Sequence, residues 1–449
     1  MQNLKIWSYL SLPWMLAALF FFVSFIFLAF FKGTQIEYLT NDYLLGLFKN
    51  TFVLSFLTAL ISALIAVPLA ILVTFYNFPG KKFFSWSLSL SIAFPAYVYA
   101  FIYVGIFEYS SPISSYLRNF GIMLPSIKNL FGASVVLSMA LFPYIYLLLR
   151  VKLTSVGLDL FRAAKSLGNN NTASIFKVII PSLFPVIIAG MTLVIFETIA
   201  DFGGVSTLRI ETFTVGIYNA WFGYQSYFSA ARLAGYLLIF VFIIIFIAKY
   251  YERKQRNLAQ KTSEVFEGMK LVPYKSFLAS LYCSFIFTIV FLIPIGQLLI
   301  WASKENNFLN IENMYLFFNS LTLGIIVSII TVFFGIALAL AYRSQKKIRL
   351  GISISSSGYA VPGSVISAGL LVSFGYFFKV SITSFGIIGL VFCLSLRFMT
   401  PAYNYLSAAL LNIKESSENA LATYSKDSMR AFTYFYFPHM KSAIYLGLM

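Results

Sequence analysis

Two carboxylates and one arginine are the charged side chains whose placement could serve chemistry in this strongly apolar chain. Glu197 and Asp201 stand four residues apart at the end of one apolar run, and Arg397 stands in the middle of another. A charge in or beside a membrane span is expensive to bury and usually faces the bundle interior or water. Hard oxygen ligands suit a highly charged cation, so one interpretation places both acids at the mouth of a solute pathway with Arg397 as a pathway residue. The alternative is structural: the acids cap a helix end or pair with an arginine, and Arg397 partners an acid.

Other side chains able to do chemistry are sparse. The sequence has one histidine, His439, and two cysteines, Cys283 and Cys393, which both lie inside long apolar runs. Two isolated thiols without Cys or His neighbours favour apolar filling over metal ligation. The sequence has no G-x-x-x-x-G-K-[ST] phosphate loop and no nucleophile–base constellation. We therefore predict a protein that is not an enzyme, with no catalytic residue, no metal and no cofactor of its own.

The elements that must position these residues are long apolar helices. Hydrophobic residues make up 60% of the chain and charged residues only 10%. About 20 apolar residues in a helix cross a hydrocarbon layer of about 30 Å, and the runs do not alternate as barrel strands would. The fold class is therefore an all-α polytopic membrane protein with an uncleaved first helix. The predicted spans are residues 6–31, 50–76, 84–107, 131–150, 181–201, 232–250, 276–302, 317–342, 351–378 and 385–411, and an eleventh that begins near Pro438.

The basic residues cluster in every second loop. Lys and Arg outnumber Asp and Glu by 32 to 15. This alternation is the positive-inside pattern, and it predicts a multi-pass protein of the bacterial inner membrane with a cytoplasmic N-terminus and cytoplasmic basic loops. Membrane lipid, rather than nucleic acid, is the expected surrounding. The clusters lie at residues 81–82, 150–177, 253–275, 343–349 and 414–441.

The chain also repeats itself in parallel orientation. Segments 94–98 and 361–365 each place a proline inside a predicted span, where we expect a bend. Three correspondences at equivalent places in the topology indicate duplication. The matched segments are residues 50–55 with 319–324, 94–98 with 361–365, and 151–181 with 412–438.

The duplication predicts two transmembrane modules. The first comprises residues 1–260 and the second residues 261–449, with about six helices in each and a polar cytoplasmic linker at 251–275 between them. The second module is expected to be incomplete at its C-terminus, because its last predicted span begins near Pro438 and the sequence stops inside it.

The loop at 151–181 predicts two short helices joined by a glycine. Residues 160–167 form the first, which Gly168 stops in a left-handed conformation. Asn171 or Thr172 is expected to cap the second, and Pro181 opens the next span. A helix–glycine–helix elbow of this kind suits docking against a soluble partner.

This loop resembles the EAA loop of binding-protein-dependent ABC importer permeases, which has the pattern E-A-A-x-x-x-G with a proline thirteen residues after the glycine. Four residues match in type and spacing, while Arg162 stands at the glutamate position. Small alanines at the centre of the pattern would permit close approach of a partner. The first predicted coupling loop comprises Arg162, Ala163, Ala164, Leu167, Gly168 and Pro181.

The second loop keeps the spacing but departs further from the pattern. Ala420 and Pro438 match in type, whereas Asn419 stands for the glutamate and Ser425 for the glycine. The resemblance implies that both loops dock on an ATP-binding cassette ATPase dimer at the cytoplasmic face, with ATP bound on that partner.

The segment after the fifth span resembles iron(III)-transport permeases of the fused two-module type. It carries A-D-F-G at 200–203, T-F-T-V-G-I-Y at 212–218 and W-F at 221–222. The resemblance implies that solute passes from a periplasmic solute-binding protein to the cytoplasm by alternating access. The same importer class for thiamine, polyamine or phosphonate is the first alternative. An ion-gradient-driven secondary transporter is the second, although such proteins favour inverted repeats.

Overall fold

The computed structural model describes residues 5–32, 40–154, 158–253, 269–304, 310–379, 382–411, 413, 415–424 and 427–448. These residues are helical apart from turns and one short parallel pair of strands, β1 (Tyr76–Asn77) and β2 (Met269–Lys270). Eight helices in the described ranges are long and apolar enough to cross a membrane, or nine if one bent pair counts as a span. The predicted all-α polytopic fold is confirmed.

The chain forms two compact units, and both are discontinuous in sequence. Unit 1 comprises Met1–Ile36, Ile217–Ile239 and Asn307–Met449, and unit 2 comprises Glu37–Gly216 and Phe240–Asn306. The first span of the chain therefore packs with helices of the second repeat. The first span of the second repeat packs, in turn, with helices of the first. The predicted repeat boundary near residue 260 therefore differs from the boundaries of the compact units, each of which includes the first helix of the other predicted repeat.

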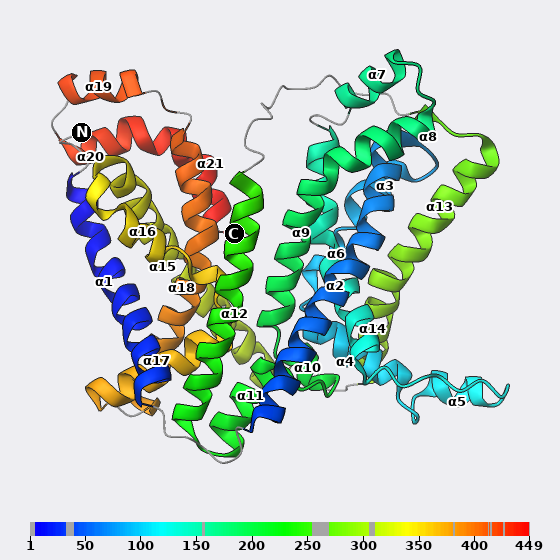
Figure 1. Cartoon of the computed structure of the whole chain (residues 1–449), viewed down its shortest axis with the longest axis horizontal. Helices are drawn as coiled ribbons and strands as arrows, with labels where there is room; N and C mark the ends of the chain where they lie inside the picture. Colours follow the sequence, from blue (N-terminus) through cyan, green and yellow to red (C-terminus); the bar gives the residue numbers. More distant parts are fainter. Residues whose placement is uncertain are drawn as a thin grey trace. The chain divides into compact units, whose positions relative to one another are not determined.

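Unit 1 is built around two long helices, α15 and α18 (Figure 1). α11 (Phe213–Tyr218) and α12 (Tyr227–Arg253) run from one unit into the other. The further elements of unit 1 are α1 (Lys5–Phe27), η2 (Leu28–Lys32), η6 (Asn219–Gly223), α15 (Ile311–Ser344), η8 (Lys346–Ile348), α16 (Arg349–Ser355), η9 (Gly358–Ala360), α17 (Gly363–Phe378), α18 (Ile382–Leu411), α19 (Glu415–Tyr424), α20 (Ser428–Ala431), η10 (Phe432–Tyr436) and α21 (Phe437–Leu448).

Unit 2 is built around α2, α6 and α9. The buried alanines of α2 at 59, 63, 66 and 70 follow helical spacing, and small side chains allow close helix packing within a membrane. Its elements are α2 (Asn41–Phe75), β1, α3 (Lys81–Ser87), η3 (Leu90–Ala93), α4 (Ala96–Phe107), α5 (Pro112–Arg118), α6 (Leu130–Lys152), α7 (Leu158–Ser166), α8 (Asn171–Ser174), η5 (Ile175–Ile179), α9 (Ile180–Ala200), α10 (Gly203–Thr207), β2, α13 (Pro273–Phe287), η7 (Thr288–Leu292) and α14 (Ile293–Lys304).

The exchanged first helices are tied in by polar contacts. In unit 1, Trp14 of α1 donates its indole N–H to the Ser355 carbonyl at 3.3 Å. In unit 2, Tyr103 of α4 donates its hydroxyl to the Ile289 carbonyl of η7 at 2.5 Å. Tyr99 of α4 donates its hydroxyl to the Val290 carbonyl, also in η7. The π-helical turn η7 brings backbone carbonyls within reach of these tyrosines, and a buried polar group needs such a partner.

Two predicted spans prove to be broken rather than bent. The helices at Lys81–Ala93 and Ala96–Arg118 meet at 91°. Pro95 is the N-cap of α4 and Pro362 the N-cap of α17, and a short 3₁₀ turn precedes each proline. Proline lacks an N–H and disfavours helix in the residue before it, so each run stops and restarts. The bends predicted within 84–107 and 351–378 are therefore complete breaks of the helix at Pro95 and Pro362.

The duplication predicted from the sequence is visible in the irregular turns. A 3₁₀ turn stands before Pro95 in one repeat and before Pro362 in the other. A π-helical turn follows each predicted coupling loop, as η5 in the first repeat and η10 in the second. Irregular turns at equivalent positions support the predicted parallel repeat, since long apolar helices alone would fit many folds.

Candidate functional site

The first coupling loop forms an elbow at one end of unit 2 (Figure 1). There α7 contacts the end of α2 through one pair of rings. Phe161 is buried, and its ring centroid lies 5.3 Å from that of Phe75. Ala164 is also buried, one turn later. These two side chains form the inner face of α7, and burial of the phenylalanine is what holds the helix to the bundle.

Gly168 ends α7 in the left-handed conformation that the sequence predicted, with φ of +84°. Its N–H donates to the Lys165 carbonyl at 3.0 Å, and the Asn169 N–H donates to the Ala164 carbonyl at 3.2 Å. This pair of bonds is a Schellman motif, which satisfies the last carbonyls of a helix. An added Cβ at Gly168 would meet no atom within 4 Å, so the glycine serves the turn rather than close packing.

The outer face of α7 is exposed. Arg162 and Ala163 are exposed, and Leu167 exposes 83% of its surface. Of the two alanines expected to permit close approach, only Ala163 lies on this face, because Ala164 points inward. The exposed leucine next to the elbow is an apolar group that a partner could cover.

The second helix of each elbow starts at an equivalent cap. The Asn170 side chain accepts from the Ala173 N–H at 2.7 Å, and the Asp427 side chain accepts from the Met429 N–H at 2.9 Å. The expected caps Asn171 and Thr172 instead begin α8 itself, one residue too late. Pro181 and Pro438 both stand in the first turn of the helix that follows the π turn, where the missing proline N–H costs least.

The second elbow is anchored differently. Ala420 of α19 is exposed, Pro438 is exposed in α21, and Ser425 lies outside the described residues. Asn419 lies within α19. Glu418, which sequence reasoning did not single out, is buried at the position that Phe161 holds in the first elbow. The sequence did contain a signal for this position. The 257-residue offset that aligns Pro181 with Pro438 also aligns the apolar Phe161 with the charged Glu418.

Glu418 lies at the centre of a polar network in unit 1. Its carboxylate forms an ion pair with Arg343 at 3.1 Å and accepts a hydrogen bond from the Tyr436 hydroxyl at 3.2 Å. The Arg343 guanidinium also donates to the carbonyls of Leu410 and Ile413 at the end of α18. The side chain of Glu418 is 5% exposed and that of Arg343 is 22% exposed.

Asp201 acts as a helix cap. Its side-chain oxygen accepts from the Val205 N–H at 2.9 Å in α10, and its carbonyl accepts from the Thr214 hydroxyl at 2.8 Å. This is the structural alternative that the sequence left open, and a cap of this kind satisfies an otherwise unpaired N–H. The predicted role of Asp201 in a solute pathway stays a prediction.

Burial raises the pKa of the Asp201 carboxyl to about 6, while bonds from the N–H groups of Val205 and Gly204 act in the opposite direction. The charge of Glu197 raises this pKa further. Glu197 is half-buried one turn earlier in α9. The two acids are thus neighbours, as their spacing predicted.

Gly203 and Gly204 were not recognised as close-approach positions in the sequence. A Cβ at Gly203 would lie 2.7 Å from Cβ of Tyr97 in α4, and one at Gly204 would press on the Asp201 carboxylate and Leu137. The A-D-F-G-G run therefore forms a tight turn that packs α10 against α4 and α6. Adjacent glycines directly after a span were the available signal.

Arg397 lies half-buried in α18 of unit 1. A Cβ at Gly363, the first residue of α17, would lie 3.1 Å from its Nη1 atom. Gly363 thus leaves room for the guanidinium beside the break at Pro362. The predicted choice between a structural and a pathway role for Arg397 stays open.

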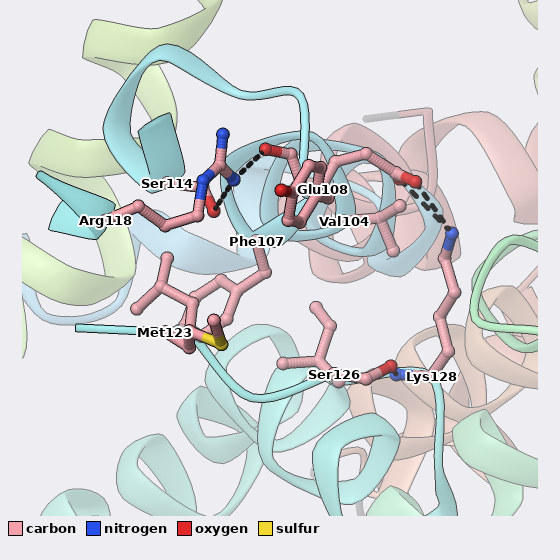
Figure 2. A pocket seen from close by; sticks show the side chains of 11 residues that line it. Val104, Phe107, Glu108, Ser114, Arg118, Met123, Ser126 and Lys128 are labelled. Atoms are coloured by element: carbon pink, nitrogen blue, oxygen red, sulfur yellow. Dashed lines mark hydrogen bonds and ion pairs between the residues drawn. The ribbon is translucent and has the colours of Figure 1, made fainter. Parts of the chain in front are cut away.

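A pocket of about 290 Å³ lies in unit 2 between α4, α5 and the segment before α6 (Figure 2). Its charged groups bind one another: Lys128 pairs with Glu108 at 3.2 Å, and the Arg118 guanidinium lies 3.8 Å from the centre of the Tyr109 ring. Arg118 also bonds to the Tyr109 carbonyl and to Ser114. These contacts fold the loop onto itself and assign no ligand to the pocket.

No group of three or more His, Cys, Asp or Glu side chains that could hold a metal occurs among the described residues. Cys283 is fully buried in α13 and Cys393 half-buried in α18, both inside candidate spans as expected. His439 lies in α21, where its ring contacts the Phe435 carbonyl at 2.7 Å.

The two elbows have the same order of parts: a short helix, a capped turn, a π turn and a proline at the start of the next helix. Residues 66–257, which include the first elbow, match the family described as binding-protein-dependent transport system inner membrane component. The chain resembles importer permeases. The resemblance predicted from the EAA-like loop is thereby confirmed.

Known relatives transport different solutes. An Fe(3+)-transport system permease protein of Haemophilus influenzae is 24% identical over 75% of this chain and 65% of its own length. A sulfate transport system permease protein of Escherichia coli is 24% identical over 38% of this chain and 60% of its own length. A probable sulfate transport system permease protein of Chlorokybus atmophyticus is 28% identical over 35% of this chain and 55% of its own length. The chain thus spans less than two thirds of each of these relatives.

Proposed function

We propose that this multi-pass membrane protein is the permease of an ATP-driven importer in a bacterial inner membrane. A periplasmic binding protein delivers the solute, and a separate ATPase dimer binds ATP and docks on the cytoplasmic elbows formed by α7 and α19. The observation that carries the proposal is the pair of equivalent elbows, of which the first lies in the segment that matches binding-protein-dependent permeases. Exposed Leu167 and Ala163 offer the ATPase a small apolar contact.

Two features of this architecture support transport by alternating access. The spans broken at Pro95 and Pro362 are hinge-like discontinuities within each repeat. Closure of an ATPase dimer would push on the elbows, and packed helices respond to such a force by switching between two arrangements. The two modules, 1–260 and 261–449, each supply one elbow and one broken span.

Iron(III) is the proposed solute, because the relative that aligns over most of this chain is an iron(III) permease. Sulfate is the second candidate, since two of the sulfate permeases align over 38% and 35% of this chain. The described residues contain no metal-holding cluster, which fits an importer in which the binding protein selects the solute. The ligand of the binding protein distinguishes iron(III) from sulfate, and from thiamine, polyamine or phosphonate.

Site-specific photo-cross-linking tests the docking. A photo-reactive amino acid at Leu167 should capture an ATPase in cells, whereas the same group at exposed Tyr116 of α5 should not. Capture of the ATPase at Tyr116 but not at Leu167 would place the partner on the wrong loop and refute the proposal.

A further inference from the structure

The second elbow matches the coupling pattern less well than the first, but it is held by more polar contacts. Four elements meet there: Arg343 at the end of α15, the last carbonyls of α18, Glu418 of α19 and Tyr436 of η10. In the first elbow, the equivalent contact is the apolar pair of Phe161 with Phe75.

The two anchors differ in directionality. Contact between phenylalanine rings tolerates sliding and tilting, because apolar burial has no preferred direction. Hydrogen bonds to a carboxylate weaken steeply when distance or angle changes. Glu418 accepts from Arg343 and Tyr436 at once, which fixes the rotation of α19 as well as its distance from α15.

Loss of only one partner in this network would also be strongly destabilising. A carboxylate that is 5% exposed must keep its partners, because an unpaired buried charge is strongly destabilising. The same guanidinium bonds the carbonyls of Leu410 in α18 and of Ile413 just after it, so its displacement from Glu418 would strain these bonds as well. A movement of α15 or α18 is therefore passed to α19 through a single guanidinium.

We propose that Glu418, Arg343 and Tyr436 form a positioning network that makes α19 move as one body with α15 and α18. This inference rests on the proposed function, in that α19 is taken as the second ATPase-docking helix. Glu418 is a positioning residue that acts through α19, and the network compensates for the departures from the coupling pattern at Asn419 and Ser425. The first elbow, held by rings, keeps freedom to slide.

The anchor itself is testable on the full chain in lipid vesicles. A nitroxide at Ser416→Cys, in a background of Cys283→Ala and Cys393→Ala, reports the motion of α19. Glu418→Leu should mobilise this label, and Tyr436→Phe should mobilise it less, because it removes one bond of the network. A label at Ser166→Cys on α7 should stay unchanged in both variants. An immobile α19 label in Glu418→Leu would overturn the network.

The coupling is tested in vesicles that also hold the ATPase and the binding protein. Glu418→Gln keeps the hydrogen-bonding shape but not the charge, and we expect solute taken up per ATP to fall about tenfold while the ATPase stays bound. Glu108→Gln, the same change in a surface ion pair with Lys128 that lies outside both elbows, should keep this ratio within about twofold. An unchanged ratio in Glu418→Gln and in Glu418→Leu would refute the positioning role. Absence of ATP-driven uptake in the unmodified chain would instead refute the proposed function. In that case the nitroxide measurement would still show whether the network immobilises α19.

Discussion

At the scale of a single residue, a side chain placed at Gly168 would strain the backbone without clashing with a neighbour. Its φ of +84° strains any branched side chain, although no atom lies near an added Cβ. Gly168→Val should cost about 1–2 kcal/mol locally and displace the elbow. We expect the variant to insert but to retain less of its ATPase in co-purification.

Gly168→Asn is the matched control, because asparagine adopts the left-handed region more readily than other residues. It should keep ATPase binding close to that of the unmodified chain. Equal binding by the valine and asparagine variants would show that the left-handed turn does not position the elbow.

Asp201 predicts a pH dependence of stability. Its pKa in the folded protein is about 6, above an ordinary value near 3.8. Its stabilising contribution is therefore full below about pH 4 and is lost as the pH rises through 6. Asp201→Asn keeps an acceptor for the Val205 N–H but cannot ionise, so its thermal unfolding in detergent should lose this dependence. A pH profile between 4 and 7 that is unchanged in Asp201→Asn would contradict this assignment.

Asp201→Asn also separates the two roles that the sequence left open. As a cap, asparagine is equivalent to aspartate, so uptake should be kept. If the carboxylate lines the solute path, uptake of a cation should fall although the fold is intact.

Single-residue roles were predictable where local geometry decides them. Gly168 could be recognised because a glycine at the end of a short amphipathic helix has one common use. For Glu418 the repeat offset was the one signal, since a charge in a polar loop is ordinarily exposed. Its burial depends on Arg343, which lies 75 residues earlier in the sequence.

At the scale of elements, η9 lies close against the backbone of α18. A Cβ at Gly358 would overlap the Leu396 carbonyl, whereas one at Gly375 in α17 would meet nothing within 4 Å. Gly358→Ala should therefore push the broken span off α18 and destabilise the protein by about 1–3 kcal/mol. Gly375→Ala should be neutral or stabilise by up to about 1 kcal/mol.

Thermal unfolding of both purified variants in detergent gives the comparison. A lower melting temperature is expected for Gly358→Ala alone. Equal melting temperatures would mean that η9 does not lie against the α18 backbone.

The long helices could be predicted because apolar length is a strong signal, and α2, α6 and α15 contain the expected runs. The broken spans could not, because a proline inside an apolar run does not say whether the helix bends or restarts. The π turns η5 and η10 have no sequence signature of their own, and only the repeated proline marks their position.

At the scale of the whole molecule, the proposed orientation rests on the alternating basic loops. Ser166 on α7 and Asn119 after α5 are both exposed and belong to loops on either side of α6. In the chain without Cys283 and Cys393, a membrane-impermeant maleimide applied to intact cells should label Asn119→Cys and not Ser166→Cys. The opposite result would invert the proposed topology.

The exchange of first helices between the compact units was beyond sequence reasoning. An apolar span at 6–31 fits either repeat equally well by composition. Only particular contacts, such as the bond from Trp14 to the Ser355 carbonyl, assign it to the second. The predicted repeat boundary near 260 therefore does not coincide with a boundary of the compact units.

Reconstituted uptake tests the central claim most directly. Vesicles would contain the chain with its ATPase, the loaded binding protein outside and ATP inside, and radioactive iron(III) or sulfate uptake would be measured with and without an ionophore. We predict uptake that requires ATP, the ATPase and the binding protein together and that persists when ion gradients are collapsed. Uptake that continues without the ATPase and stops with the ionophore would contradict the account and identify a gradient-driven transporter.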